Sequence, residues 1–377
     1  MTWTPHQQPW DRTRAAHLFR RAAFGANQNE LERALSDGPA KTIDRLLKPS
    51  ADVTAFNREQ DACETLTLPE LRGWWLRRMM ATPHPLLEKM TLFWHGCFGV
   101  GFNRVNHADL MRAHIRTLRA HALGKFDALL SALVHDPALF LAAGGADNPK
   151  AKPNEYFARQ LLTRYTIGDG QFTPRDVTDT ARAFTGFHVR GGKWRDVPSD
   201  HDDGPKTIFG QTGPWTPSDF ARLAAKQPTT ARRVVRALYR CFISEEQEPT
   251  DEMIEPLVRS FAADLDIGKL VATMLRSQIF FSSPLQRVKS PVELVIGICR
   301  TLGVTVPTLP LGAELAELGQ NLYQPPTLKG WPGGRAWINH ATIIGRTKLV
   351  TRLLGNKKFP ADLFDVADPA SPEFQLA

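Results

Sequence analysis

The sequence lacks the short signatures that identify the commonest nucleotide-binding and hydrolytic enzymes. It has no GxxxxGK[ST] loop, no GxSxG elbow, no HExxH motif and no GxGxxG followed by a suitable acid. ATP-driven, α/β-hydrolase and nicotinamide-dependent activities therefore lack support. The loop from Asp200 to Gly204 is not an EF-hand, because its glycine is misplaced and no Glu closes a twelve-residue frame.

Cysteines and long apolar runs are also scarce. The four cysteines are far apart and form no CxxC pair, so the sequence indicates neither a zinc ribbon nor a disulfide framework, and scattered thiols suit a reducing compartment. No apolar run approaches the roughly 20 residues of a membrane helix. The N-terminus has no apolar core of a secretory signal. We therefore expect no membrane span and a cytoplasmic location, with export left open by the choice of start codon.

The charge composition does not favour a nucleic-acid-binding protein. The formal net charge is +8 over 377 residues, and Lys and Arg are scattered rather than concentrated in a tail. Such a distribution is typical of a solvated basic surface. The apolar fraction of 42% and the charged fraction of 23% are ordinary for a globular protein, so a large core is expected.

Apolar residues recur with helical spacing through most of the chain. Clear examples cover residues 68–81, 85–98 and 106–123. The strand signal at 187–197 contains two adjacent glycines that fit a hairpin turn. We therefore predict a mainly α fold, a multi-helical globular bundle with long ordered loops and one small β-hairpin. The predicted domain covers 1–360, with an N-terminal helical subdomain at 11–48 and a flexible C-terminal tail at 361–377.

The stretch from Asn148 to Gly168 combines a loop, a helix start and an apolar face. Asn154 is a strong helix N-cap, because its side-chain oxygen can accept a hydrogen bond from a free first-turn N–H. Glu155 follows where the positive helix end favours a carboxylate. Gly168 is the expected end of the helix. This pattern is equally typical of a site and of an ordinary helix start.

Residues 106–123 form a predicted helix with histidines on one edge and arginines on the other. Its histidines are seven residues apart, about 10 Å along a helix, which is too far for two ligands of one ion. The arginines Arg112, Arg116 and Arg119 could bind an anionic polymer, but a solvated face explains them better.

A polar loop around residue 203 and two other sites carry chemistry-bearing side chains. His201, Asp202 and Lys206 lie close together in sequence, His95 lies between aromatic residues, and Glu155 begins a helix. If folding brings them together, the histidines and carboxylates could bind Zn, Mn or Fe, and Lys206 could stabilise negative charge. The alternative is a buried polar network that mimics a site.

The loop at 321–337 is rich in aromatic residues, proline and glycine. Its Trp331-Pro332-Gly333-Gly334 segment could present an aromatic platform to a sugar or a peptide. The alternative is that the tryptophans anchor the loop to the helical body.

Nine segments, in this order, resemble one family. They are HLFRRAAFG (17–25), MTLFWHGCF (90–98), ALGKFDALL (122–130), HDPAL (135–139), KPNEYFARQLLTRYTIG (152–168), DVTDTARAFTGF (176–187), HDDGPKTIFG (201–210), KSPVELVIG (289–297) and QPPTLKGWPGGRAWI (324–338). The chain resembles a bacterial member of the domain-of-unknown-function 1800 family. The resemblance implies a mostly helical fold and no established activity. Relatives are often encoded beside a sulfatase-like family, which implies a sulfatase-like protein as a partner.

The resemblance also selects candidate site residues. His95, His201 and Asp202 match the family pattern and are the predicted metal ligands, while Glu155, Lys206 and Arg159 match as predicted catalytic residues. The chain departs from the pattern at Cys97, where the family has a second His, and at Gln160 and Arg164, where it has acids.

Three hypotheses follow from the sequence. The first is an enzyme that performs metal-assisted hydrolysis with a divalent ion held by His95, His201 and Asp202. The second is a non-enzymatic assembly or binding partner of the sulfatase-like protein. The third is a protein that binds an anionic polymer.

Overall fold

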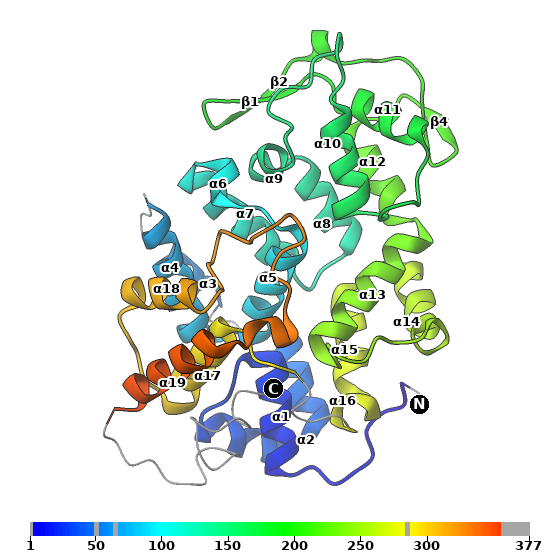
Figure 1. Ribbon diagram of the computed structural model, residues 1–377. Coiled ribbons are helices and arrows are strands. Elements are labelled where there is room, and N and C mark those ends of the chain that lie inside the picture. The colour runs from blue at the N-terminus through cyan, green and yellow to red at the C-terminus, as the bar shows by residue number, and fades with distance from the viewer. Residues whose placement is uncertain (1–2, 49–52, 63–66, 283–286, 356–377) are drawn as a thin grey trace.

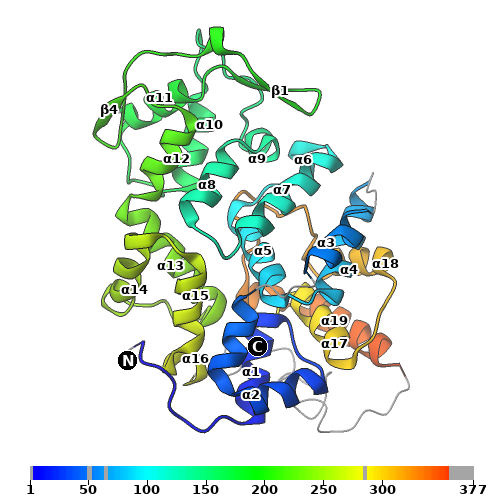
Figure 2. The ribbon, with the colours of Figure 1, turned by 180° about the vertical axis from the view of Figure 1, so that it is seen from behind.

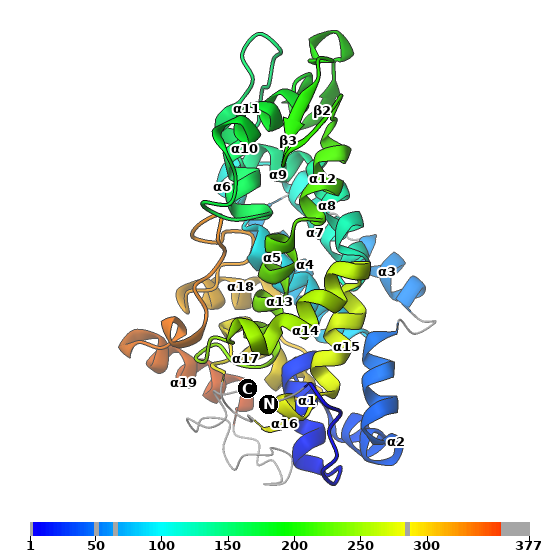
Figure 3. The same ribbon diagram turned by 90° about the vertical axis from the view of Figure 1, so that its right-hand side faces the viewer.

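The computed structural model describes residues 3–48, 53–62, 67–282 and 287–355 of the chain. Within these ranges the chain forms nineteen α-helices and two separate two-stranded antiparallel sheets. The predicted mainly α class, with a small hairpin near 187–197, is confirmed. Figure 1 shows an elongated molecule with the strands at one end and the first two helices at the other, and the views in Figures 2 and 3 show the same long axis. None of the described helices is long and apolar enough to cross a bilayer.

The chain alternates helices with short turns over most of its length. The helices before residue 190 are α1 (Arg12–Ala23), α2 (Gln28–Leu47), α3 (Val53–Asp61), α4 (Leu68–Ala81), α5 (Pro85–Phe98), α6 (Phe102–Val105), α7 (Ala108–His121), α8 (Phe126–Val134), α9 (Pro137–Ala142), α10 (Glu155–Gln160) and α11 (Pro174–Ala183). The later helices are α12 (Pro217–Ala225), α13 (Pro228–Phe242), α14 (Asp251–Asp264), α15 (Ile267–Arg276), α16 (Gln278–Ser282), α17 (Pro291–Leu302), α18 (Thr308–Glu317) and α19 (His340–Leu354). The strands are β1 (Phe187–Arg190), β2 (Lys193–Asp196), β3 (Lys206–Ile208) and β4 (Gln211–Gly213), and the non-α helical turns are η1 (Leu161–Tyr165), η2 (Pro198–Asp200) and η3 (Gly334–Trp337).

A large hydrophobic core extends from α1 to α19, and a small second cluster lies between α17 and α19. Leu18, Leu31 and Ile43, from the predicted N-terminal subdomain, belong to it, so the first two helices share their core with the rest of the chain. The predicted end of the domain at residue 360 and the predicted tail at 361–377 lie outside the described residues.

Helix α5 runs through the middle of the molecule (Figure 1). It begins at Pro85, whose missing N–H costs nothing at the first helical position, and it ends at Gly99, which is in the left-handed conformation. Leu86 and Met90 are fully buried in the core. Phe93 and Cys97, which follow on the same helix face at spacings of three and four residues, are only partly buried. The C-terminal half of this face of α5 can therefore form the wall of a cavity.

A buried carboxylate joins α5 to its two neighbours. Glu88 accepts hydrogen bonds of 2.6 Å from Arg78 on α4 and from Arg119 on α7. Burial raises the pKa of Glu88, but the two guanidinium groups overcome this effect and lower it overall. Arg112 and Arg116 bind the carbonyl and the carboxylate of Asp61. The arginine edge of α7 is thus engaged within the protein, and this weakens the anionic-polymer hypothesis for these residues.

Two hairpins lie at the end of the molecule near α11. The first pairs β1 with β2 across Gly191 and Gly192, both with positive φ, as the turn chemistry predicts. The second, β3 with β4, lies where the sequence indicates only a loop. Asp179 accepts from the N–H of Thr207, and Asp176 accepts from the N–H of Phe209, at 2.6 Å in each case. Side chains of α11 therefore order this segment, a contact that local sequence patterns do not reveal.

Candidate functional site

The predicted metal ligands lie in different surroundings. His95, on α5, is fully buried, and its ring lies 5.4 Å from that of Trp75 and 5.5 Å from that of Trp331. Burial lowers the pKa of His95 to about 3, which keeps the ring neutral. His201 instead donates from Nδ1 to the carbonyl oxygen of Thr185, at 2.8 Å. Among the described residues, no three His, Cys, Asp or Glu side chains form a group that could hold a metal ion.

Asp202 and Lys206 have structural partners at the hairpin end. Asp202 receives hydrogen bonds from Arg182 at 2.7 and 3.1 Å and from the N–H of Gly204 at 2.9 Å. The hydrogen bond from Arg182 is the main reason why the pKa of Asp202 falls to about 2. Lys206 is buried and donates to the carbonyl of Gly204 at 3.2 Å. These contacts fit the polar-network alternative, and the metal and catalytic roles stay predictions.

Glu155 and Arg159 lie on α10, as predicted, and both are exposed. Asn154 caps the helix, because its side chain accepts from the N–H of Phe157 at 2.9 Å. Glu155 accepts from the hydroxyl of Thr178, at 2.7 Å, which connects α10 to α11. The helix cap is thus confirmed, while the catalytic role of Glu155 and Arg159 stays a prediction.

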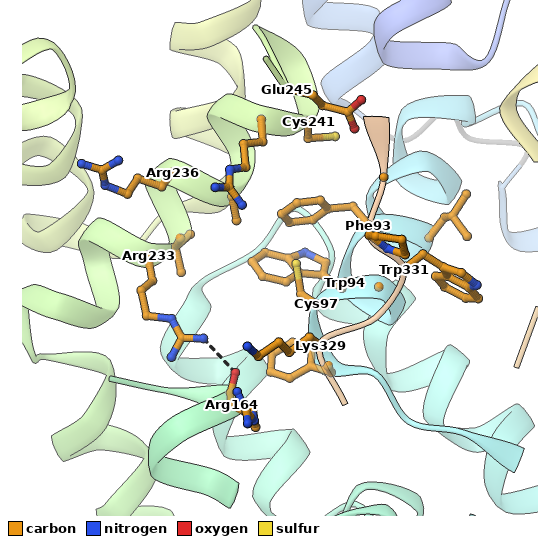
Figure 4. Close-up of a pocket in the computed structure, with 18 of the residues that line it drawn as sticks. Phe93, Trp94, Cys97, Arg164, Arg233, Arg236, Cys241, Glu245, Lys329 and Trp331 are labelled. Atoms are coloured by element: carbon orange, nitrogen blue, oxygen red, sulfur yellow. Dashed lines mark hydrogen bonds between the residues drawn. The ribbon is translucent and has the colours of Figure 1, made fainter. Parts of the chain in front are cut away.

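A cavity of about 720 Å³ lies beside the exposed half of α5. Its walls come from α5, from η1 and the turn after it, from α13, from the start of α17 and from the loop 329–337. Figure 4 shows three regions: Arg164, Arg233 and Lys329 on one side, Glu245 and Cys241 on the opposite side, and aromatic rings between them. Of the predicted site residues none lines this cavity, although His95 contacts the ring of Trp331, which does.

The wall containing Arg164 depends on a distortion of the helix that begins at Glu155. After Gln160 the chain widens into the π-helix η1, a form that is rare and frequently found at functional sites. Arg233 of α13 donates to the carbonyls of Thr163, Arg164 and Thr166 at 2.9 to 3.0 Å. These contacts join the end of η1 to α13, two elements that both line the cavity.

The first side of the cavity is cationic. Arg164 has one acidic neighbour among the described residues, Asp169, at 3.8 Å, and the Asp169 side chain is 75% exposed. Burial and the neighbouring Arg164 both lower the pKa of Arg233. Lys329, at the exposed rim, forms no ion pair with any described residue. This cation cluster, meaning Arg164, Arg233 and Lys329, carries more positive charge than its neighbours neutralise.

The opposite side contains a buried ion network. Glu293 lies 2.7 Å from Lys89 and 2.6 Å from Arg287, and Arg287 also lies 3.1 Å from Oε1 of Glu245. Burial raises the pKa of Glu293, but Arg287 and Lys89 outweigh burial and hold it well below its usual range. The second oxygen of Glu245, Oε2, is buried and has no hydrogen-bond partner in the described part of the chain. One acceptor is therefore available at this end.

The middle of the cavity is aromatic and contains a thiol. Phe93 and Trp94 come from α5, and Trp331 comes from the loop opposite (Figure 4). Burial raises the pKa of Cys97 to about 12, with a further contribution from Cys241. The Cys97 thiol therefore stays protonated near neutral pH, and a thiolate nucleophile is not expected.

Sequence reasoning missed the residues that give this cavity its charge. Arg233, Arg236 and Arg240 recur at spacings of three and four residues, which place them on one face of a helix, and this spacing can be read from the sequence. The sequence does not show where these arginines lie relative to Lys329, because that depends on how a distant loop packs. The Trp331 loop, a candidate platform on its sequence, lines the cavity.

The comparisons with known proteins give one match. The sequence model of a family described as a protein of unknown function (DUF1800) matches residues 17–374. A search of curated proteins and a search of solved structures gave no match.

Proposed function

The chain belongs to the DUF1800 family of unknown function, and we propose that it binds a small anionic ligand in the cavity beside α5. The observation that carries this proposal is the cation cluster of Arg164, Arg233 and Lys329, whose one ion-pair partner among the described residues is the exposed Asp169. Like charges held together raise the free energy of the empty site, and a bound anion lowers it.

The size and lining of the cavity support a small molecule as the ligand. Ligand pockets in proteins are typically about 300–1,000 Å³ and combine apolar walls with a few polar groups. The cavity has this combination, because aromatic rings of α5 and the loop separate two polar ends. Cys97 adds no charge to the wall, since its thiol is neutral, so the net positive charge of the first end is not offset there.

A direct test measures the binding of inorganic sulfate and phosphate by calorimetry at constant ionic strength. We expect the wild-type chain to bind these anions and the double variant Arg164→Gln/Lys329→Gln to lose most of the affinity. A matched control, Arg259→Gln/Lys269→Gln, removes one Arg and one Lys from exposed positions away from the cavity. Equal binding by all three proteins would contradict the proposal, since only the first double variant alters the cation cluster.

A further inference from the structure

We infer that the ligand is an acidic sugar, a sugar that carries a carboxylate or a sulfate ester. Its acid group would lie against Arg164 and Lys329, and a hydroxyl group would donate to Glu245 at the opposite end. This inference rests on the proposed function and assigns the chemical class of the ligand.

Unpaired polar atoms in the cavity lining are the first argument. Apart from Lys89 Nζ and Arg287 Nε, which have ion-pair partners, four donors in the lining residues are buried without a hydrogen-bond partner in the described part of the chain: Tyr165 Oη, Thr230 Oγ1, Trp331 Nε1 and Trp337 Nε1. Buried polar groups in native proteins are nearly always paired, so unpaired groups that cluster in one cavity indicate a missing partner. Hydroxyl groups both donate and accept, so a polyhydroxylated ligand matches a set of donors with one free carboxylate oxygen.

The surroundings of Glu245 decide between a hydroxyl and an ammonium group. Arg287 already lies against Oε1 of Glu245, and both Arg287 and Lys89 belong to the same buried network. The two cations balance the two carboxylates of this network, so an added ammonium group would leave an excess positive charge beside Arg287 in a poorly solvated site. A neutral donor is not repelled. This argues against an amino acid or a polyamine and favours a hydroxyl group.

The aromatic residues between the two ends fit a ring with apolar C–H faces. Phe93 and Trp331 lie between the cation cluster and Glu245 and are only partly buried (Figure 4). A planar aromatic acid would also suit these rings, but it would leave the free donors and Glu245 Oε2 unpaired, at a cost in affinity. A sugar ring fits both the apolar middle and the polar edges.

The experiment compares ligands that differ in one property each, with calorimetry on the full chain. Glucuronate and glucose 6-sulfate carry hydroxyls and an acid, cyclohexanecarboxylate carries the ring and acid alone, and glucose carries the hydroxyls alone. We expect one of the acidic sugars to bind at least about tenfold more tightly than both reference compounds, the effect of one or two net hydrogen bonds. Whether glucuronate or glucose 6-sulfate binds better identifies the acid as carboxylate or sulfate.

Two nearly isosteric variants locate the hydroxyl contacts. Thr230→Val and Glu245→Gln should lower the affinity for the acidic sugar severalfold relative to that for cyclohexanecarboxylate, because both ligands meet the same change of wall charge and only the sugar loses a hydrogen bond. Thr273→Val, at a half-buried position on α15, should leave this ratio unchanged. Equal affinity for glucuronate and cyclohexanecarboxylate, with both lost in Arg164→Gln/Lys329→Gln, would overturn the sugar assignment and keep the anion site. Failure of every anion to respond to that double variant would instead overturn the proposed function.

Discussion

The guanidinium group of Arg233 donates a 2.9 Å hydrogen bond to the backbone carbonyl of Arg164 (Figure 4). The same group donates to the carbonyls of Thr163 and Thr166. One side chain of α13 thus pairs three carbonyls around the end of a distorted helix, where carbonyl groups lack intrahelical partners. Its positive charge also suits the negative end of the helix dipole. Arg233 therefore has a structural role beside its contribution to the cation cluster.

Replacing Arg233 should expose this structural role. Arg233→Met keeps the aliphatic stem of the side chain and removes all three hydrogen bonds. We therefore expect the free energy of unfolding to fall by about 2–3 kcal/mol. Urea titration followed by circular dichroism measures the change. Arg222→Met, on α12, removes an exposed arginine and should change the free energy by less than about 1 kcal/mol. Equal losses in the two variants would show that the carbonyl contacts of Arg233 do not stabilise the fold.

The same contact shows why the sequence predicted the helix at 154–168 but not its form. Asn154 acts through neighbours three residues away, so its capping role is readable from local sequence. The π-helix at 161–165 contains no glycine or proline that would indicate it in the sequence. The side chain that pairs its carbonyls, Arg233, lies about seventy residues later. Local patterns identify helices because apolar spacing is local, and they miss features that a distant side chain stabilises.

The candidate site was harder to predict for a related reason. The sequence around His95 is unusual because it is rich in aromatic residues, and the structure surrounds this histidine with rings. Its expected partners, His201 and Asp202, instead bind Thr185 and Arg182 near the hairpins. Sequence separation contains no distances, so the convergence of these residues was a hypothesis, and their role in metal binding stays a prediction.

Gly330 is expected to be essential for the loop that carries Lys329 and Trp331. Its φ is +80°, and a Cβ at this position would lie 2.0 Å from the carbonyl oxygen of Gly96 on α5. Gly330→Ala should therefore displace the loop from α5 and reduce both stability and anion binding. Gly210→Ala is the control, because Gly210 has a similar φ of +76° but a Cβ added there would meet no atom within 4 Å. The control should lose only the roughly 1–2 kcal/mol of the left-handed conformation.

Urea titration and calorimetry on the two alanine variants measure these effects. We expect Gly330→Ala to be the less stable of the two and to bind anions more weakly than Gly210→Ala. Similar stability and similar affinity in both variants would show that the loop tolerates a shift away from α5.

The buried, neutral ring of His17 should make the protein less stable in acid. Its Nε2 contacts the carbonyl of Phe280 at 3.0 Å, and burial with the nearby Arg21 and Arg20 lowers the pKa of His17 to about 3. The unfolded chain takes up a proton near pH 6.5, whereas the folded protein does not until about pH 3. The unfolded state therefore binds more protons in this window, and stability falls as pH is lowered from 6.5, by up to about 1.4 kcal/mol per pH unit.

The variant His17→Gln isolates this contribution. Its amide can still donate to the carbonyl of Phe280, but it cannot titrate. We expect the wild type to lose stability relative to the variant as pH falls from 7 to 4.5, measured by urea titration at several pH values. Parallel pH profiles would show that His17 is not kept neutral in the folded protein.

Arg164 offers the sharpest test of the electrostatics of the cavity. Its one acidic neighbour in the described chain, Asp169, is 3.8 Å away and largely exposed, so the ion pair contributes little to stability. Arg164→Gln should weaken anion binding, and Arg164→Glu should weaken it further, by at least about tenfold relative to the wild type, because attraction becomes repulsion. Cys97→Ser, which replaces a neutral thiol in the same wall, should change affinity little. Calorimetry at two salt concentrations measures the affinity of all three variants, and the salt dependence of that affinity should decrease from wild type to Arg164→Gln.

If Arg164→Glu binds the anion as tightly as Arg164→Gln does, the charge at residue 164 does not act on the ligand, and the anion must lie elsewhere.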